Sequence, residues 1–173
     1  MAIIFEMQVD FDDDREACRL FCDYMANKLE PFMINGKTIN FHFPSNTFVS
    51  VPADGWTNIT ICPMNIGFGV SCDDGDHITM TDDEMFELSL YMYHLIKSAP
   101  GYTCALVGWE LGDINTIVNN YRKEPAYTAD GLVLHKDKYG DFKLEGREEF
   151  DEHHFWYPLE SAFGNVFGDD DEE

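Results

Sequence analysis

The spacing of hydrophobic residues predicts one strand and two amphipathic helices. Residues 2–11 are apolar and then alternate apolar with polar side chains, which predicts a strand. Residues 13–29 place their apolar side chains on one helical face, and Pro31 stops that helix. Residues 82–97 repeat apolar side chains every three or four positions and predict the second helix. The core positions expected on this second helix are Leu88, Met92 and Leu95.

Short strands are predicted between the two helices. Asn35-Gly36 is a preferred hairpin turn, and the residues after it alternate in a strand pattern up to Pro44. Three further strand segments, separated by prolines and an Asp-Gly pair, are residues 46–52, 56–63 and 65–72. Strands this closely spaced in the sequence favour an antiparallel meander.

The second half of the chain completes an α+β pattern. Residues 102–111 predict a buried strand, and residues 113–130 predict a short polar helix with a loop. Residues 131–137 predict a short edge strand or a turn, and no clear period follows them. Because helices lie among the strands without a regular strand–helix–strand alternation, the fold class is α+β.

The length of the chain favours one domain. A chain of 173 residues can bury one substantial core, but it is short for two domains. We therefore expect a single α+β domain over residues 1–168, with a mostly antiparallel sheet packed by the two main helices. Residues 169–173 form an acidic C-terminal tail.

The acids before the second helix do not form a calcium motif. Thr81 and Glu84 have the spacing of a capping box, which accounts for the acids of the first helical turn. Asp73, Asp74 and Asp76 precede it, but the positions of calcium ligands fail from either starting aspartate. A turn built by these residues is the simpler interpretation.

Neither zinc ligands nor catalytic signatures appear elsewhere. His153 and His154 are adjacent, so their side chains point apart and provide at most one ligand each. The sequence contains no nucleophile elbow, phosphate loop or dinucleotide fingerprint. We therefore expect no metal, no cofactor and no enzymatic activity.

The cysteines and the N-terminus favour a cytoplasmic protein. Five cysteines are odd in number and follow no disulfide framework. The first residues lack the basic and apolar regions of a secretory signal, and no apolar run approaches the roughly 18 residues that span a bilayer.

Charge narrows the class of partner. The chain has 33 acidic against 11 basic residues, a net charge of −22. Without the five acids of the tail, 28 acids still face 11 bases, a net charge of −17, so the folded domain itself is acidic. Such a field disfavours direct contact with nucleic acid or an anionic membrane and favours a basic protein partner. Solubility alone is the plain alternative explanation.

The most suggestive stretch for partner binding mixes aromatic and acidic residues after position 148. Rings can anchor a protein partner while carboxylates pair with its lysines and arginines. The same rings could instead form a layer of the core. The candidate partner-binding residues are Asp151, Glu152, Phe155, Trp156 and Tyr157, together with Asp73, Asp74 and Asp76.

Two stretches of the chain carry a resemblance to a known family: "ALVGWELGD" at residues 105–113 and "GLVLHKDKY" at residues 131–139. The chain resembles the small acidic immunity proteins of bacterial polymorphic-toxin systems, which accompany contact-dependent toxins or toxins of type VI secretion. The resemblance implies a cytoplasmic inhibitor that binds one toxin domain and blocks its active site. The acidic charge of the chain predicts that this partner is basic, and an enzyme acting on nucleic acid or a nucleotide is the expected class. It transfers no functional residue, because immunity interfaces share no motif.

Two other functions remain open from the sequence, and so does the oligomeric state. One is a phage-type inhibitor whose carboxylates imitate nucleic-acid phosphates. The other is a hydrolase-like enzyme that uses dispersed acids and histidines. The acid runs available for phosphate mimicry are residues 10–14, 73–76, 148–152 and 169–173.

Overall fold

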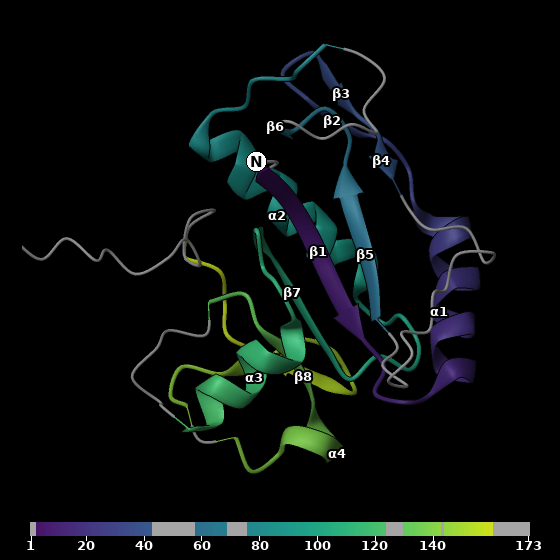
Figure 1. Cartoon of the computed structure of the whole chain (residues 1–173), viewed down its shortest axis with the longest axis vertical. Coiled ribbons are helices and arrows are strands. Elements are labelled where there is room, and N and C mark those ends of the chain that lie inside the picture. The colour runs from purple at the N-terminus through teal and green to yellow at the C-terminus, as the bar shows by residue number, and fades with distance from the viewer. Residues whose placement is uncertain (1–2, 43–57, 69–75, 124–129, 143, 161–173) are drawn as a thin grey trace, which may run out of the picture.

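The computed structural model describes residues 3–42, 58–68, 76–123, 130–142 and 144–160. Its centre is an antiparallel pair of strands, β1 (Ile3–Asp10) and β7 (Cys104–Trp109) (Figure 1). The other strands are β2 (Phe32–Ile34), β3 (Lys37–Ile39), β4 (Phe41–His42), β5 (Asn58–Pro63), β6 (Gly67–Phe68), β8 (Val133–His135), β9 (Glu148–Glu149) and β10 (His154–Trp156). The helices are α1 (Arg15–Lys28), α2 (Asp82–Ile96), α3 (Ile114–Lys123) and α4 (Lys136–Tyr139).

The main sheet has the order β4-β5-β1-β7-β8-β10-β9, and β6 also pairs with β1. All of these pairings are antiparallel, while β2 and β3 form a separate hairpin. The expected single α+β domain with a mostly antiparallel sheet is therefore confirmed. The strand expected at residues 46–52 lies outside the described residues.

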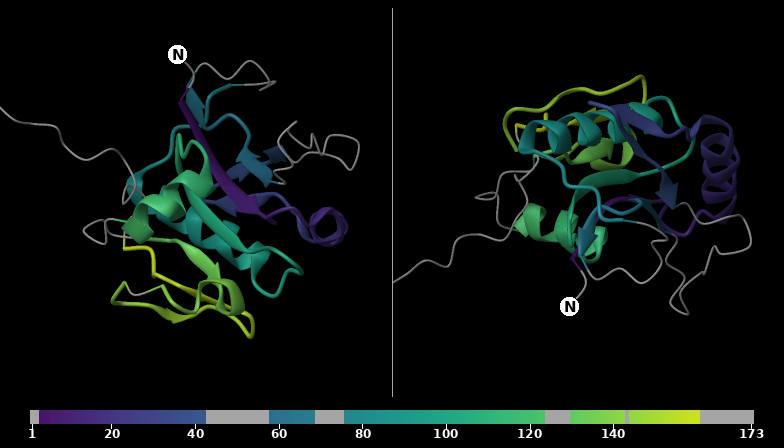
Figure 2. Two further views of the ribbon diagram at one scale, coloured as in Figure 1. Left: turned by 60° about the horizontal axis from the view of Figure 1, so that its bottom comes forward. Right: turned by 90° about the horizontal axis from the view of Figure 1, so that it is seen from above.

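The two faces of the sheet bury different clusters of side chains. Phe5, Met7 and Val9 alternate along β1 and are fully buried with the apolar faces of α1 and α2. Leu106 and Leu134 project to the opposite face, where they pack with α3. Figure 2 shows α2 and α3 on opposite sides of the strands. The sheet is thus covered by helices on both faces.

Sequence signals set the ends of the main helices. Asp14 caps α1 by accepting a hydrogen bond from the Ala17 amide at 2.9 Å. Thr81 and Glu84 form the expected capping box of α2. The expected core positions of α2 are confirmed, since Leu88, Met92 and Leu95 are 0%, 0% and 7% exposed.

The last third of the chain differs from the sequence prediction. The segment at residues 131–137 is not at an edge, because β8 lies between β7 and β10 inside the sheet. The region after residue 139, which shows no period in the sequence, contributes β9 and β10. These strands are two and three residues long, which is too short for alternation to stand out.

Glu84 joins the β2–β3 hairpin to the start of α2. Its carboxylate accepts hydrogen bonds from the Thr81 amide at 2.9 Å and from Asn35 Nδ2 at 2.9 Å, and it also pairs with the Lys37 ammonium. The Glu84 side chain is only 6% exposed. Hydrogen bonds from Lys37, Thr81 and Asn35 lower the pKa of Glu84 to about 2.

Acid titration should expose the contribution of Glu84. Because its pKa falls from 4.5 to about 2 on folding, its stabilisation is present above pH 4.5 and is lost as the pH falls toward 2. Urea midpoints measured between pH 5 and pH 2 should fall less steeply for Glu84→Gln than for the natural protein. Glu87→Gln, at an exposed position one turn away, serves as the control. Parallel profiles for the natural protein and Glu84→Gln would contradict this account.

Candidate functional site

A groove lies between α2 and the last two strands of the sheet. Its volume is about 250 Å³. We call it the edge groove, because β9 ends the sheet order at this side. The residues that line the edge groove are Leu90, Tyr93, His94, Lys97, Glu148, Glu149, Phe150 and Trp156.

Three aromatic rings form the floor of the edge groove. The Trp156 ring lies 5.5 Å from Tyr93 and 5.4 Å from Phe150, measured between centroids. Tyr93 is held in place because its hydroxyl oxygen accepts a hydrogen bond from the Val107 amide at 2.9 Å. Trp156 is half-buried, so part of its indole faces solvent. The groove therefore presents a fixed aromatic surface.

The two walls of the edge groove carry opposite charges. Glu148 and Glu149 are exposed on the β9 side, and Lys97 is exposed on the α2 side. The Lys97 ammonium lies over the Phe150 ring, 5.8 Å from its centroid. The aromatic floor thus already accommodates one basic side chain of the protein itself.

The structure places the three predicted aromatic anchors on different faces. Trp156 lines the edge groove as a binding residue would. Phe155 and Tyr157 are 6% and 5% exposed and belong to the cluster under α3. The expectation that these two rings lie on a binding surface is wrong, because neighbouring residues of a strand point to opposite faces.

The predicted acidic residues also separate. The Asp151 side chain is 4% exposed, whereas Glu152 and Asp76 are exposed. Asp73 and Asp74 lie outside the described residues. Asp151 is therefore wrongly predicted as a surface carboxylate, because its side chain is used inside the protein.

Asp151 forms a buried network with His154. Its carboxylate lies 2.9 Å from His154 Nδ1 and accepts hydrogen bonds from the amides of His153 and His154 at 2.8 and 2.9 Å. A fourth hydrogen bond comes from the Ser98 amide at 3.1 Å. His154 Nε2 lies 3.0 Å from the Tyr102 carbonyl oxygen, and the two rings stack at 3.9 Å. Both nitrogens of the imidazole face oxygen acceptors, so both bonds form only when each nitrogen carries a hydrogen.

A second, more polar cleft of about 380 Å³ lies where β1 ends. Asp10 is 1% exposed there and accepts hydrogen bonds from the Asp12 amide and Asn115 Nδ2, both at 2.9 Å. Burial raises the pKa of Asp10 against the effect of these bonds. Arg122 and Lys138 also line this cleft, and Lys138 pairs with Asp12. These residues come from distant segments, so the sequence contains no local signal for the cleft.

Within the described ranges, no group of three or more His, Cys, Asp or Glu side chains is arranged to hold a metal ion. In the same part of the chain, no helix is long and apolar enough to cross a membrane.

Comparison with known proteins found no relative. No family model, no curated protein and no solved structure matches this chain.

Proposed function

We propose that this protein is a cytoplasmic immunity-type inhibitor, which binds a basic toxin domain in a stoichiometric complex and blocks it without turnover. The observation that carries the proposal is the edge groove, where the half-buried Trp156 lies beside the exposed carboxylate of Glu148. A ring for anchoring beside a carboxylate for pairing is the combination that receives basic protein surfaces.

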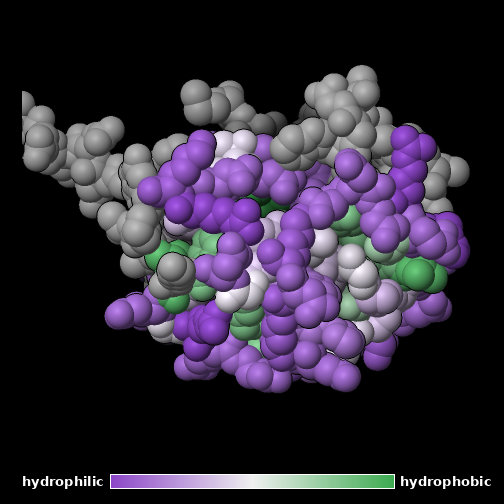
Figure 3. Space-filling view, turned by 90° about the horizontal axis from the view of Figure 1, so that it is seen from below, coloured by the Kyte–Doolittle hydropathy of each residue, from purple (hydrophilic) through white to green (hydrophobic). Residues whose placement is uncertain are grey.

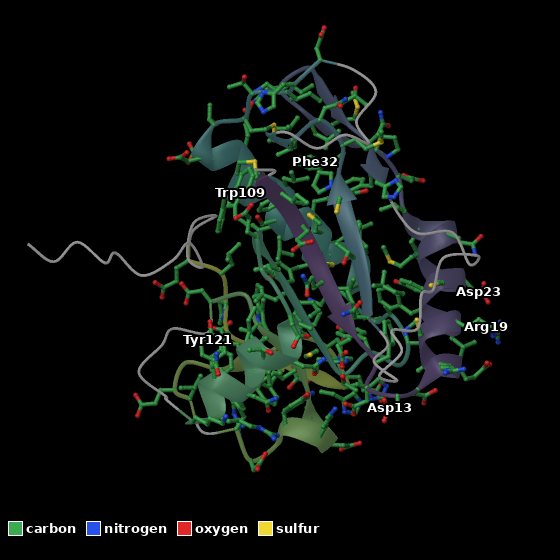
Figure 4. The ribbon with its side chains drawn as sticks, in the orientation of Figure 1. Asp13, Arg19, Asp23, Phe32, Trp109 and Tyr121 are labelled. Carbon is green, nitrogen blue, oxygen red and sulfur yellow. The ribbon has the colours of Figure 1, made fainter. Side chains whose placement is uncertain are left out.

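The distribution of charge supports a basic partner. Many of the basic side chains are already engaged by the protein itself, so the acids in excess are left to face a partner. Arg19, for example, lies 2.8 Å from Asp23 on the outer side of α1 (Figure 4). The side chains in ion pairs with the protein's own carboxylates are Arg19, Lys37, Arg122, Lys136 and Lys138. Those that lie over aromatic rings without such a pair are Lys28, Lys97 and Arg147.

The surface also supports a localised contact. The face shown in Figure 3 is mainly hydrophilic, with hydrophobic residues in small separate areas. An acidic surface of this kind attracts a basic protein from a distance, while a few rings supply most of the binding free energy. A phosphate mimic needs carboxylates but no aromatic floor. The aromatic rings of the edge groove therefore favour a partner that is anchored by ring contacts over one that is bound only through its DNA-binding surface.

The test uses a toxin domain encoded beside the gene for this chain, purified together with this protein. We expect a defined stoichiometric complex in which the toxin's activity is lost. The association rate should fall about tenfold or more between low and high salt, because the Debye length shrinks from about 30 Å at 0.01 M to about 3 Å at 1 M. Dissociation should change little, since it depends on buried contacts.

Two outcomes would replace the proposal. Inhibition at far less than one protein per toxin, abolished by a single Asp or His substitution, would indicate an enzyme. Displacement of this protein from its target by duplex DNA, with target binding retained in Trp156→Ala, would indicate phosphate mimicry instead.

A further inference from the structure

The β9–β10 pair places one ring and one carboxylate on each face of the sheet edge. Phe155 is paired with Glu149, and Trp156 is paired with Glu148. Directly opposed residues of antiparallel strands project to the same face, with Cβ atoms about 5 Å apart. Successive residues project to opposite faces. The two ring–carboxylate pairs therefore lie back to back.

The Phe155–Glu149 pair already holds basic side chains of the protein. The guanidinium carbon of Arg147 lies 5.1 Å from the centroid of the Phe155 ring. Lys136 Nζ lies 3.0 Å from Glu149 Oε1. A ring and a glutamate placed in this register thus attract cations in this protein itself.

The Trp156–Glu148 pair lacks corresponding cations. Among the residues that the structure describes, no lysine or arginine lies over the Trp156 ring and none forms an ion pair with Glu148. The nearby cation of the edge groove, Lys97, lies over Phe150 instead. Indole is the strongest cation–π acceptor among the protein rings, so a cation over Trp156 would be held more strongly than one over Phe155.

We propose that the Trp156–Glu148 pair binds the guanidinium group of an arginine from the protein partner. This inference rests on the proposed function, since it assumes that the partner is basic. A planar guanidinium can stack on the indole face while its N–H groups donate to the carboxylate. A lysine ammonium is a compact charge without a flat face, so it satisfies the two groups less well.

The remaining walls of the edge groove suit a single bound cation. The Trp156 ring is fixed by Phe150 and Tyr93, so little conformational freedom is lost on binding. Lys97 lines the opposite wall and disfavours a second positive charge. We therefore expect one arginine to enter from the β9 side, and Lys97→Gln to strengthen its binding.

Titration with small probes tests the site directly. The probes are N-acetyl-L-arginine methylamide and its lysine counterpart, followed through the indole N–H signal of Trp156 by NMR. That signal is assigned by its absence in Trp156→Phe. The arginine probe should give a saturable shift and bind more tightly than the lysine probe. Glu148→Gln should weaken the arginine probe by about threefold to tenfold, as expected for the loss of a charge-assisted hydrogen bond.

Glu145→Gln is the matched control, because Glu145 is an exposed glutamate of the same segment that does not line the edge groove. It should leave the affinity of the arginine probe unchanged. The absence of a saturable shift, equal binding of both probes, or equal weakening by the two glutamine variants would each overturn the proposal. If the protein blocks its toxin but does not bind the arginine probe, this site is wrong and the inhibitor function stands. If the arginine probe binds but the protein inhibits no toxin, the arginine site stands and the inhibitor function is wrong.

Discussion

Asp151→Ala is expected to lower the free energy of unfolding by about 3–5 kcal/mol, because hydrogen bonds to a charged group contribute roughly 1.5–3 kcal/mol each and several are lost together. The substitution leaves His154 and the amides of His153 and Ser98 without their acceptor, and the His154 side chain is itself only 2% exposed. Although burial alone would raise the pKa of Asp151, hydrogen bonds from His154 and the backbone outweigh it and lower the pKa. The stabilisation is therefore present above the ordinary pKa of 3.8 and is lost as the pH falls below it.

Urea denaturation at neutral pH measures this effect. The control is Glu152→Ala, whose exposed side chain should change stability by less than about 0.5 kcal/mol. Asp151→Asn should lose less than Asp151→Ala, because the amide oxygen keeps one acceptor. Equal midpoints for the two alanine variants would show that the buried network contributes nothing. The sequence analysis predicts Asp151 as a partner-binding residue, and at an exposed position of that kind the substitution would leave stability nearly unchanged.

Leu88→Ala is expected to lower the free energy of unfolding by about 2–5 kcal/mol. Leu88 is 0% exposed and belongs to the cluster between α2 and the sheet. Its truncation removes apolar surface from the core and leaves a cavity, and the loss depends on how far the neighbours collapse into it. The same denaturation experiment provides the value.

Glu87→Ala is the matched control for Leu88→Ala, because Glu87 is the preceding residue of α2 and is exposed. Helix propensity changes little in both variants, so the difference between them reports burial. A loss below about 1 kcal/mol for Leu88→Ala would mean that this helix does not pack on the sheet as the structure has it.

Local signals predict the parts of the fold that depend on neighbouring residues. The capping box at Thr81 and the turn at Asn35-Gly36 appear in the structure where the sequence places them. The apolar face of α2 is likewise visible from its spacing alone. Each of these features depends on residues within four positions of one another, so each can be predicted from the local sequence.

The candidate site depends on contacts that cannot be predicted from the spacing of residues along the sequence. Glu148 and Trp156 meet through the register of a short strand pair, and Lys97 reaches the same groove from α2. The assignment of Phe155 and Tyr157 fails for a related reason. The sequence prediction treats adjacent rings as one surface, whereas a strand divides them between two faces. Recognising residues 154–156 as a strand would have separated Trp156 from its neighbours.

The short strand β9 also bears on aggregation. Exposed sheet edges invite pairing with another copy of the same chain, and proteins limit this with short strands and charged side chains. β9 has two residues, and both are glutamates. Two copies that met edge to edge would bring four carboxylates together, so self-assembly through this edge is opposed. A strand rich in arginine or lysine would meet no such repulsion.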